Sequence, residues 1–144
     1  EINHLMAKPY VKQPEKALPY YRAVLDRKPD HPAANYMAGR AYAALGRFED
    51  AERAYRKALS YGPGAYNNLA LLLEAEGRRD EAVRMLLDGL AAYPDEQPLL
   101  INAGRFYLKM QRNFEAKIYL EKGVRLDPGS DMAKEAAKML GAMK

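Results

Sequence analysis

Cysteine and tryptophan are absent from this chain of 144 residues, and histidine occurs only twice. Without cysteine the chain forms no disulfide, offers no thiol nucleophile and builds no cysteine-ligated zinc site. His4 and His31 have no histidine or cysteine partner at the spacing of metal ligands. The only serines, Ser60 and Ser130, have no base nearby in the sequence. We therefore predict no catalytic residue, metal or cofactor, and no enzymatic activity.

Long apolar runs and blocks of like charge are also lacking. No stretch reaches the roughly 18 apolar residues of a membrane-spanning helix, so we predict no membrane span. The formal net charge of +4 comes from 23 basic and 19 acidic residues that are interspersed, which favours solvated helix faces over a nucleic-acid site. Three oppositely charged pairs have the four-residue spacing of ion pairs on a helix surface: Glu49–Arg53, Glu52–Arg56 and Glu121–Arg125.

What the chain does have is a repeat. Four prolines follow one another at intervals of 34, 31 and 34 residues: Pro29, Pro63, Pro94 and Pro128. The same intervals separate two further sets of residues: Ala17, Ala51, Ala82 and Ala116, and Tyr21, Tyr55, Leu86 and Leu120. Intervals of 31 and 34 also relate two sets in the first half of each unit: Gly39, Ala70 and Gly104, and Tyr42, Leu73 and Tyr107. One shared phase in five sets indicates a true repeat.

The stretch from Pro32 to Pro63 is the clearest copy, and it predicts a helix, a turn and a second helix. Gly46 breaks the middle, and Pro63 ends the unit because proline cannot continue a helix. Small residues at the repeated glycine and alanine positions let the two helices approach closely. One helix pair cannot bury its apolar face alone, so successive pairs are expected to stack around a continuous core.

This pattern resembles the tetratricopeptide repeat, whose period of about 34 residues carries a Gly, Tyr, Ala, aromatic and Pro signature. Here the signature reads Gly39, Tyr42, Ala51, Tyr55 and Pro63, and the resemblance covers roughly residues 14–130. It implies an all-α fold, a right-handed α-solenoid of antiparallel helix pairs. The family's tryptophan is missing from every repeat. The RNA-binding pentatricopeptide repeat is the nearest rival, but the period and the closing proline argue against it.

We predict a single domain over residues 1–144. Its parts are a second helix of a partial repeat over 14–29, repeats over 32–63, 64–94 and 97–128, and a capping helix over 130–143.

Several local departures from the pattern lead to further predictions. A short helix is expected over Ile2–Lys8, and Pro19 should kink its helix or delay its start. The shortened junction at Gly62–Gly64 should delay the next helix until near Ala65. Gln111 stands where the other full repeats have a mid-turn glycine, so the turn of the last repeat is expected to differ. Ser130 offers a helix cap.

The resemblance implies that the first helix of each repeat lines a concave groove. Counted from the closing prolines, the candidate ligand-binding residues are Tyr36, Met37, Arg40, Asn67, Asn68, Leu71, Asn102, Arg105 and Lys109. Asn68 and Asn102 share one repeat position, where an amide can pair with a peptide backbone. Arg40 and Arg105 share another position and favour a carboxylate or an acidic peptide, although simple solubility explains these charges equally well.

Our main hypothesis is a non-catalytic scaffold that binds a peptide or protein segment in the concave groove. The alternative is a structural spacer or self-association module that uses the Met-rich C-terminal helix and forms a homo-oligomer. RNA binding is a third reading, which Leu71 and Glu74 disfavour because they interrupt the basic groove. The family's clamp for chaperone tails is matched only at Asn68, so that type of adaptor is not expected. The chain begins at Glu1 within a repeat, so we expect a piece of a longer protein or a chain that has lost a signal segment; the compartment, cytoplasmic or periplasmic, stays open.

Overall fold

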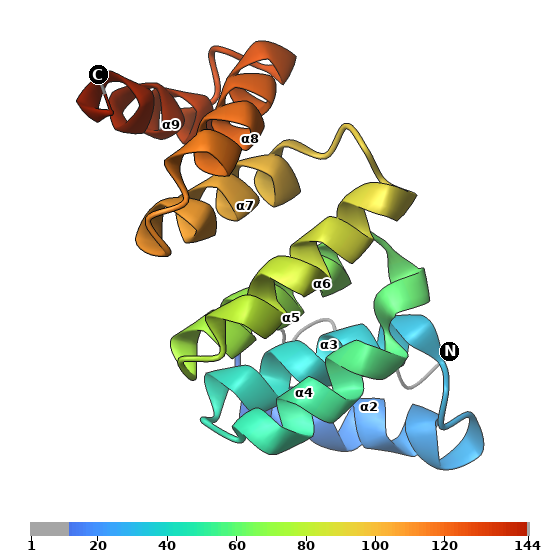
Figure 1. Ribbon diagram of the computed structural model, residues 1–144. Helices are drawn as coiled ribbons and strands as arrows, with labels where there is room; N and C mark the ends of the chain where they lie inside the picture. The colour runs from blue at the N-terminus through green and yellow to red at the C-terminus, as the bar shows by residue number, and fades with distance from the viewer. Residues whose placement is uncertain (1–11, 144) are drawn as a thin grey trace. The chain divides into compact units, whose positions relative to one another are not determined.

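The computed structural model describes residues 12–143, and every regular element in that range is helical (Figure 1). The elements are α2 (Pro14–Arg27), α3 (Pro32–Ala44), α4 (Phe48–Lys57), the short 3₁₀ helix η2 (Leu59–Tyr61), α5 (Pro63–Ala75), α6 (Arg79–Ala92), α7 (Gln97–Lys109), α8 (Asn113–Leu126) and α9 (Asp131–Ala142). The predicted all-α class of helix pairs is therefore confirmed. No helix within 12–143 is long and apolar enough to cross a membrane.

The chain divides into two compact units, which we describe one at a time. The first unit runs to Leu72 and contains α2, α3, α4, η2 and most of α5. The second unit begins at Leu73 and contains α6, α7, α8 and α9. The single domain over 1–144 and its repeat boundaries stay predictions.

Sharp turns join the helices within each hairpin, and they share one backbone geometry. Gly46 and Gly77 adopt positive φ angles of 76° and 80°, and Gln111 adopts 59° at the equivalent position. In each turn the next residue, an arginine, donates its backbone N–H to a carbonyl five residues earlier, at 2.9 Å in all three cases. The prediction of a different turn in the last repeat is therefore wrong, because Gln111 accepts a conformation that normally favours glycine.

Helix starts agree with the sequence in some places and differ in others. Ser130 caps α9, where its Oγ accepts the backbone N–H of Ala133 at 3.0 Å, as predicted. Pro19 lies inside α2 without delaying its start at Pro14. Helix α5 begins at Pro63, so the predicted start near Ala65 is wrong; Gly62 is extended (φ 159°, ψ −178°) and leads directly into the helix. The helix predicted over Ile2–Lys8 lies outside the described residues.

In the first unit, α2 and α3 pack around a core of small and aromatic side chains. The buried residues of this core are Ala17, Leu18, Tyr21, Ala38 and Ala41. Gly39 of α3 faces the Tyr55 ring of α4 so closely that an added Cβ would lie 2.7 Å from the ring carbons. The repeated glycine is thus needed for close approach of the paired helices.

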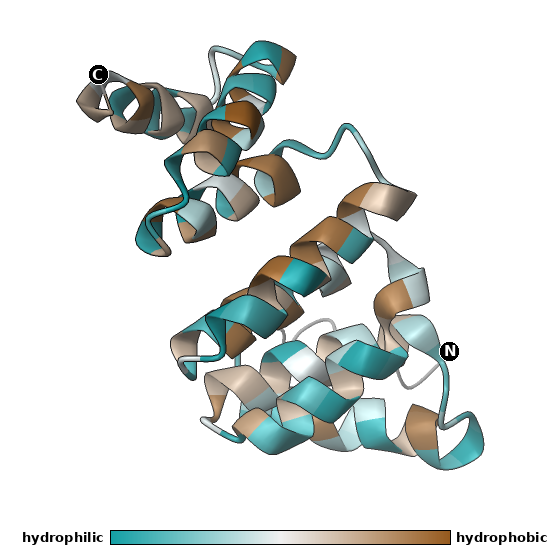
Figure 2. Ribbon diagram, in the orientation of Figure 1, coloured by the Kyte–Doolittle hydropathy of each residue, from teal (hydrophilic) through white to brown (hydrophobic). Residues whose placement is uncertain are grey.

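The second unit repeats this arrangement with α7 and α8. An added Cβ at Gly104 would lie 2.6 Å from Leu120 Cγ and 3.1 Å from the carbonyl oxygen of Ala116. The capping helix α9 contributes Ala136 to a buried cluster with Ile101 and Leu120. Its methionines are partly buried against the same cluster: Met132 and Met139, with Met143 just beyond the helix end. Bands of hydrophobic and hydrophilic residues alternate along α8 and α9 in Figure 2.

Side-chain amides tie helix ends together in both units. In the first unit, Asn35 Nδ2 donates to the carbonyl oxygens of Pro29 at 2.9 Å and His31 at 3.1 Å. In the second unit, Gln97 Nε2 donates to the carbonyl oxygens of Gly123 and Asp127, at 2.8 and 3.0 Å. Its Oε1 accepts the hydroxyl of Ser130 at 2.8 Å, so one side chain joins α7, the end of α8 and the cap of α9.

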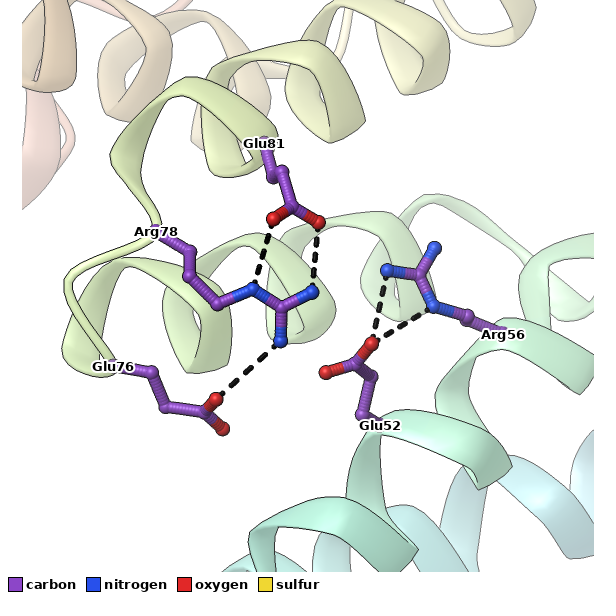
Figure 3. Close-up of polar contacts among 5 residues, drawn as sticks. All are labelled: Glu52, Arg56, Glu76, Arg78 and Glu81. Carbon is purple, nitrogen blue, oxygen red and sulfur yellow. Dashed lines mark hydrogen bonds and ion pairs between the residues drawn. The ribbon is translucent and has the colours of Figure 1, made fainter.

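Ion pairs lie on the helix surfaces, as the charge pattern indicated, but with partly different partners. Figure 3 shows Arg56 bound to Glu52, the one pair predicted correctly, at 3.0 Å. It also shows Arg78 bound to Glu76 and Glu81. The other predictions were wrong in the partner, since Arg53 contacts Asp50 and Glu121 pairs with Lys117.

Candidate functional site

In the first unit, the candidate groove residues on α3 and α5 meet through one hydrogen bond. Asn68 Nδ2 donates to the hydroxyl oxygen of Tyr36 at 3.2 Å. The Tyr36 ring also lies 4.9 Å from the Tyr61 ring and 6.2 Å from the Tyr55 ring, measured between centroids. Tyr36 is thus held between an amide and two aromatic rings, which restricts its rotamers.

A positive charge lies beside this tyrosine cluster. The Arg40 guanidinium is 6.0 Å from the centroid of the Tyr36 ring, at the outer limit of a cation–π contact, and the residue is exposed. Burial raises the pKa of Tyr55 to about 12, an effect that Tyr36 reinforces and Arg40 opposes. The Tyr55 hydroxyl therefore stays neutral at physiological pH, and Arg40 is the charged side chain beside the tyrosine cluster.

Arg40 lines two depressions on the surface of the first unit. One lies on the α3 and α5 side, has a volume of about 340 Å³ and is lined by Arg40, Ala43, Tyr55, Asn68, Leu71 and Leu72. The other lies on the α2 and α3 side, has a volume of about 200 Å³ and includes Ala17, Tyr21, Met37 and Ala44 in its lining. Leu71 is 41% exposed and Met37 is half-buried, so each depression offers apolar surface. Asn67, also a candidate, is half-buried on α5.

In the second unit, the candidate residues are bound to other side chains of the unit. Asn102 is only 3% exposed, and its Oδ1 accepts a hydrogen bond from Arg105 Nη1 at 3.2 Å. Lys109 Nζ donates to Glu74 Oε1 at 3.1 Å, and Arg79 donates to the same oxygen at 3.1 Å. These two donors lower the pKa of Glu74, which therefore stays ionised and offsets the nearby positive charge.

The two asparagines that share a repeat position consequently have different surroundings. Asn68 is half-buried and positions Tyr36, whereas Asn102 is buried and binds Arg105. Sequence reasoning missed Tyr55 and Tyr61 as neighbours of the candidate site. Tyr55 was considered only as a repeat position in the second helix of its repeat, and Tyr61 lies in η2; the predicted groove was built only on the first helix of each repeat. Within residues 12–143, no group of three or more histidines and carboxylates could hold a metal ion.

The helical hairpins and their repeated close contacts define a class: an α-helical repeat protein. Models of the tetratricopeptide repeat match residues 11–74, 64–93 and 98–130. The chain therefore belongs to the tetratricopeptide repeat family, as the sequence pattern predicted. Domains of this family generally act as scaffolds for protein–protein interaction and are typically non-catalytic.

Relatives and solved structures agree with this assignment. The chain is 31% identical over 131 residues to human protein O-mannosyl-transferase TMTC3, a match that covers 78% of this chain and 14% of the relative. It is 28% identical to TPR repeat-containing protein YpiA of Bacillus subtilis, over 80% of this chain and 28% of the relative. The chain thus spans only a small part of these curated relatives.

Among solved structures, Pseudomonas aeruginosa PilF matches with a TM-score of 0.83 and 26% identity, covering 99% of this chain and 68% of PilF. A MamA structure matches with a TM-score of 0.77 and 19% identity, covering 88% of this chain and 72% of MamA. Both likenesses support the helical-repeat fold.

Proposed function

We propose that the first unit binds a protein segment in which a carboxylate lies between two apolar side chains. The observation that carries this proposal is the position of Arg40, which is exposed and lines both of the depressions described above. A guanidinium binds a carboxylate through two parallel hydrogen bonds, so one Asp, Glu or chain terminus satisfies it. The apolar side chains on either side then enter the depressions beside Met37 and Leu71.

The tyrosine cluster supports the same function by providing a rigid wall. Tyrosine contributes a large contact area with little rotamer entropy to lose, which is why it is common at binding surfaces. Here Asn68 holds the Tyr36 hydroxyl and Tyr61 packs on the Tyr36 ring, so the wall is ordered before a ligand arrives. Capture of a peptide backbone by Asn68 or Asn102 stays a prediction; the burial of Asn102 makes Asn68 the better candidate.

The second unit is a weaker candidate for an acidic ligand. Lys109 and Arg79 both bind Glu74, which reduces the attraction that they exert on a further carboxylate. Arg105 binds Asn102. We therefore assign the main ligand contact to Arg40 and its neighbours.

Selection from a random peptide library displayed on phage tests the proposal. We expect the full chain to enrich peptides with an acidic residue or free carboxyl terminus flanked by apolar side chains. Synthetic versions of these peptides should bind at least tenfold more weakly to Arg40→Glu, measured by fluorescence anisotropy. Arg53→Glu is the matched control, because Arg53 is an exposed arginine on α4 and lines neither depression.

Two results would contradict this function. One is a selection that enriches no common peptide pattern. The other is an enriched peptide that binds wild type, Arg40→Glu and Asn68→Ala equally well. Salt gives a further check, because a charge-dependent contact should weaken as ionic strength rises.

The alternative, a spacer or self-association module built on the Met-rich C-terminal helix, stays open. The methionines of α9 already pack against the second unit's own core. A self-association surface would therefore need exposed apolar residues from a neighbouring element as well.

A further inference from the structure

The outer face of α8 carries an apolar pair that the other repeats lack. Phe114 is 78% exposed and Ile118 is 49% exposed, and they stand one helical turn apart. The equivalent pair is charged in both earlier repeats: Glu49 and Arg53 on α4, and Asp80 and Arg84 on α6. The repeat fold therefore tolerates charge at these positions, and packing within the chain does not explain the apolar pair.

A depression of about 510 Å³ borders this pair. It is lined by Asn113, Phe114, Lys117 and Glu121 from α8, and by Leu140 and Met143 at the end of α9. The α8 residues 114, 117, 118 and 121 follow the spacing of one helix face. We call this surface, with Leu140 and Met143, the α8–α9 edge. It holds both a protruding aromatic side chain and a hollow with apolar lining.

The charges of this edge are complementary to themselves. Lys117 and Glu121 lie one turn apart, and their side chains are 64% and 42% exposed. Their Nζ and Oε1 atoms are 3.9 Å apart, at the limit of an ion pair, so neither charge is strongly held by the other. A copy of the same helix running in the opposite direction would bring Lys117 of each copy towards Glu121 of the other.

We propose that the α8–α9 edge binds the same edge of a second copy of this chain. The two α8 helices cross in antiparallel orientation about a two-fold axis near Lys117 and Ile118. In this register Phe114 of each copy is level with Glu121 of the other and enters the hollow beside Leu140 and Met143. Each Lys117 then lies less than one helical turn along the helix axis from Glu121 of the other copy, within reach of the long lysine side chain. A two-fold interface requires one patch that is complementary to itself, and this edge supplies the protrusion, the hollow and both charges.

Analytical ultracentrifugation of the full chain across concentrations tests the proposal. We expect a concentration-dependent dimer for the wild type. Phe114→Glu and Ile118→Arg, which introduce the residues of repeat two, should each raise the dimer dissociation constant at least tenfold. Phe48→Glu is the control, because Phe48 is an exposed phenylalanine on α4 and should leave the constant unchanged. A wild type that stays monomeric, or a dimer that both Phe114→Glu and Ile118→Arg leave intact, would overturn the proposal.

Charge reversal tests the antiparallel register. Lys117→Glu and Glu121→Lys should each weaken the dimer, and the double variant should restore it, because each copy again presents opposite charges. Because the chain has no cysteine, Ile118→Cys should cross-link two copies under mild oxidation. Arg53→Cys, at the equivalent position of repeat two, should not. Failure of the double variant to recover, or equal cross-linking of both cysteine variants, would rule out this interface.

Discussion

At the scale of single residues, the turn at Gln111 shows how strongly the hairpin geometry is imposed. Gln111 has a φ of 59° and keeps the hydrogen bonds that Gly46 and Gly77 make in the other hairpins. A non-glycine residue in the left-handed region is destabilised by about 1–2 kcal/mol. The packing of α7 against α8 therefore outweighs the local preference of glutamine.

Replacing Gln111 with glycine should relieve this strain. We expect Gln111→Gly to raise the free energy of unfolding by about 0.5–1 kcal/mol, because the greater freedom of glycine in the unfolded chain offsets part of the gain. Urea denaturation of both proteins measures the difference. The reverse change, Gly46→Gln, should lower the free energy of unfolding because Gly46 has a positive φ angle. An added Cβ there meets no atom within 4 Å, so the backbone angle alone accounts for the loss. A destabilised Gln111→Gly would refute this explanation.

At the scale of helices, small residues determine how closely a pair can pack. Gly104 on α7 lies against Leu120 and the Ala116 carbonyl of α8, and no space is left for a methyl group. The periodic glycine in the sequence is therefore a packing requirement rather than a turn signal. Gly141, in contrast, lies near the end of α9 with no atom within 4 Å of an added Cβ.

These two glycines should respond in opposite ways to the same substitution. Gly104→Ala should lower the free energy of unfolding by about 1–3 kcal/mol, since overpacking forces the paired helices apart. Gly141→Ala should be neutral or stabilising by up to about 1 kcal/mol, because alanine favours the helix. Thermal unfolding followed by circular dichroism compares them. Equal effects at both positions would argue against the close-packing role.

At the scale of the whole molecule, the strongest helix–helix contacts within each unit are between neighbours in the chain, as expected for a repeat protein. Local stability should therefore vary along the chain rather than change as one block. Gln97 is a good test, because its three hydrogen bonds join α7, the end of α8 and the start of α9 within the second unit.

Gln97→Ala should loosen the C-terminal end selectively. The variant removes three hydrogen bonds that each contribute about 0.5–1.5 kcal/mol, so amide hydrogen exchange in α9 should accelerate at least tenfold while α3 in the first unit is unaffected. Lys122→Ala, which removes an exposed side chain of α8, should change neither helix. If exchange accelerates equally in α3 and α9, the chain unfolds as one cooperative block, which contradicts the prediction that local stability varies along the chain.

The repeat pattern in the sequence predicted most of the helices but fewer details of the surface. The cap at Ser130 follows from a local rule and was predicted. The turn at Gln111 and the start at Pro63 were not, because tertiary packing and an extended Gly62 decided them. The candidate groove was harder still: Asn68 and Asn102 occupy equivalent positions, yet one positions Tyr36 and the other is buried.

By itself, the sequence determined that this is an all-helical repeat protein, because period, small residues and closing prolines depend only on spacing along the chain. The family comparisons confirm that reading. Only the tertiary structure decided which charged side chains pair with one another, since Lys109 and Glu74 stand 35 residues apart and meet only after folding. It also decided that Phe114 and Ile118 stay exposed, because burial depends on neighbours that are distant in sequence.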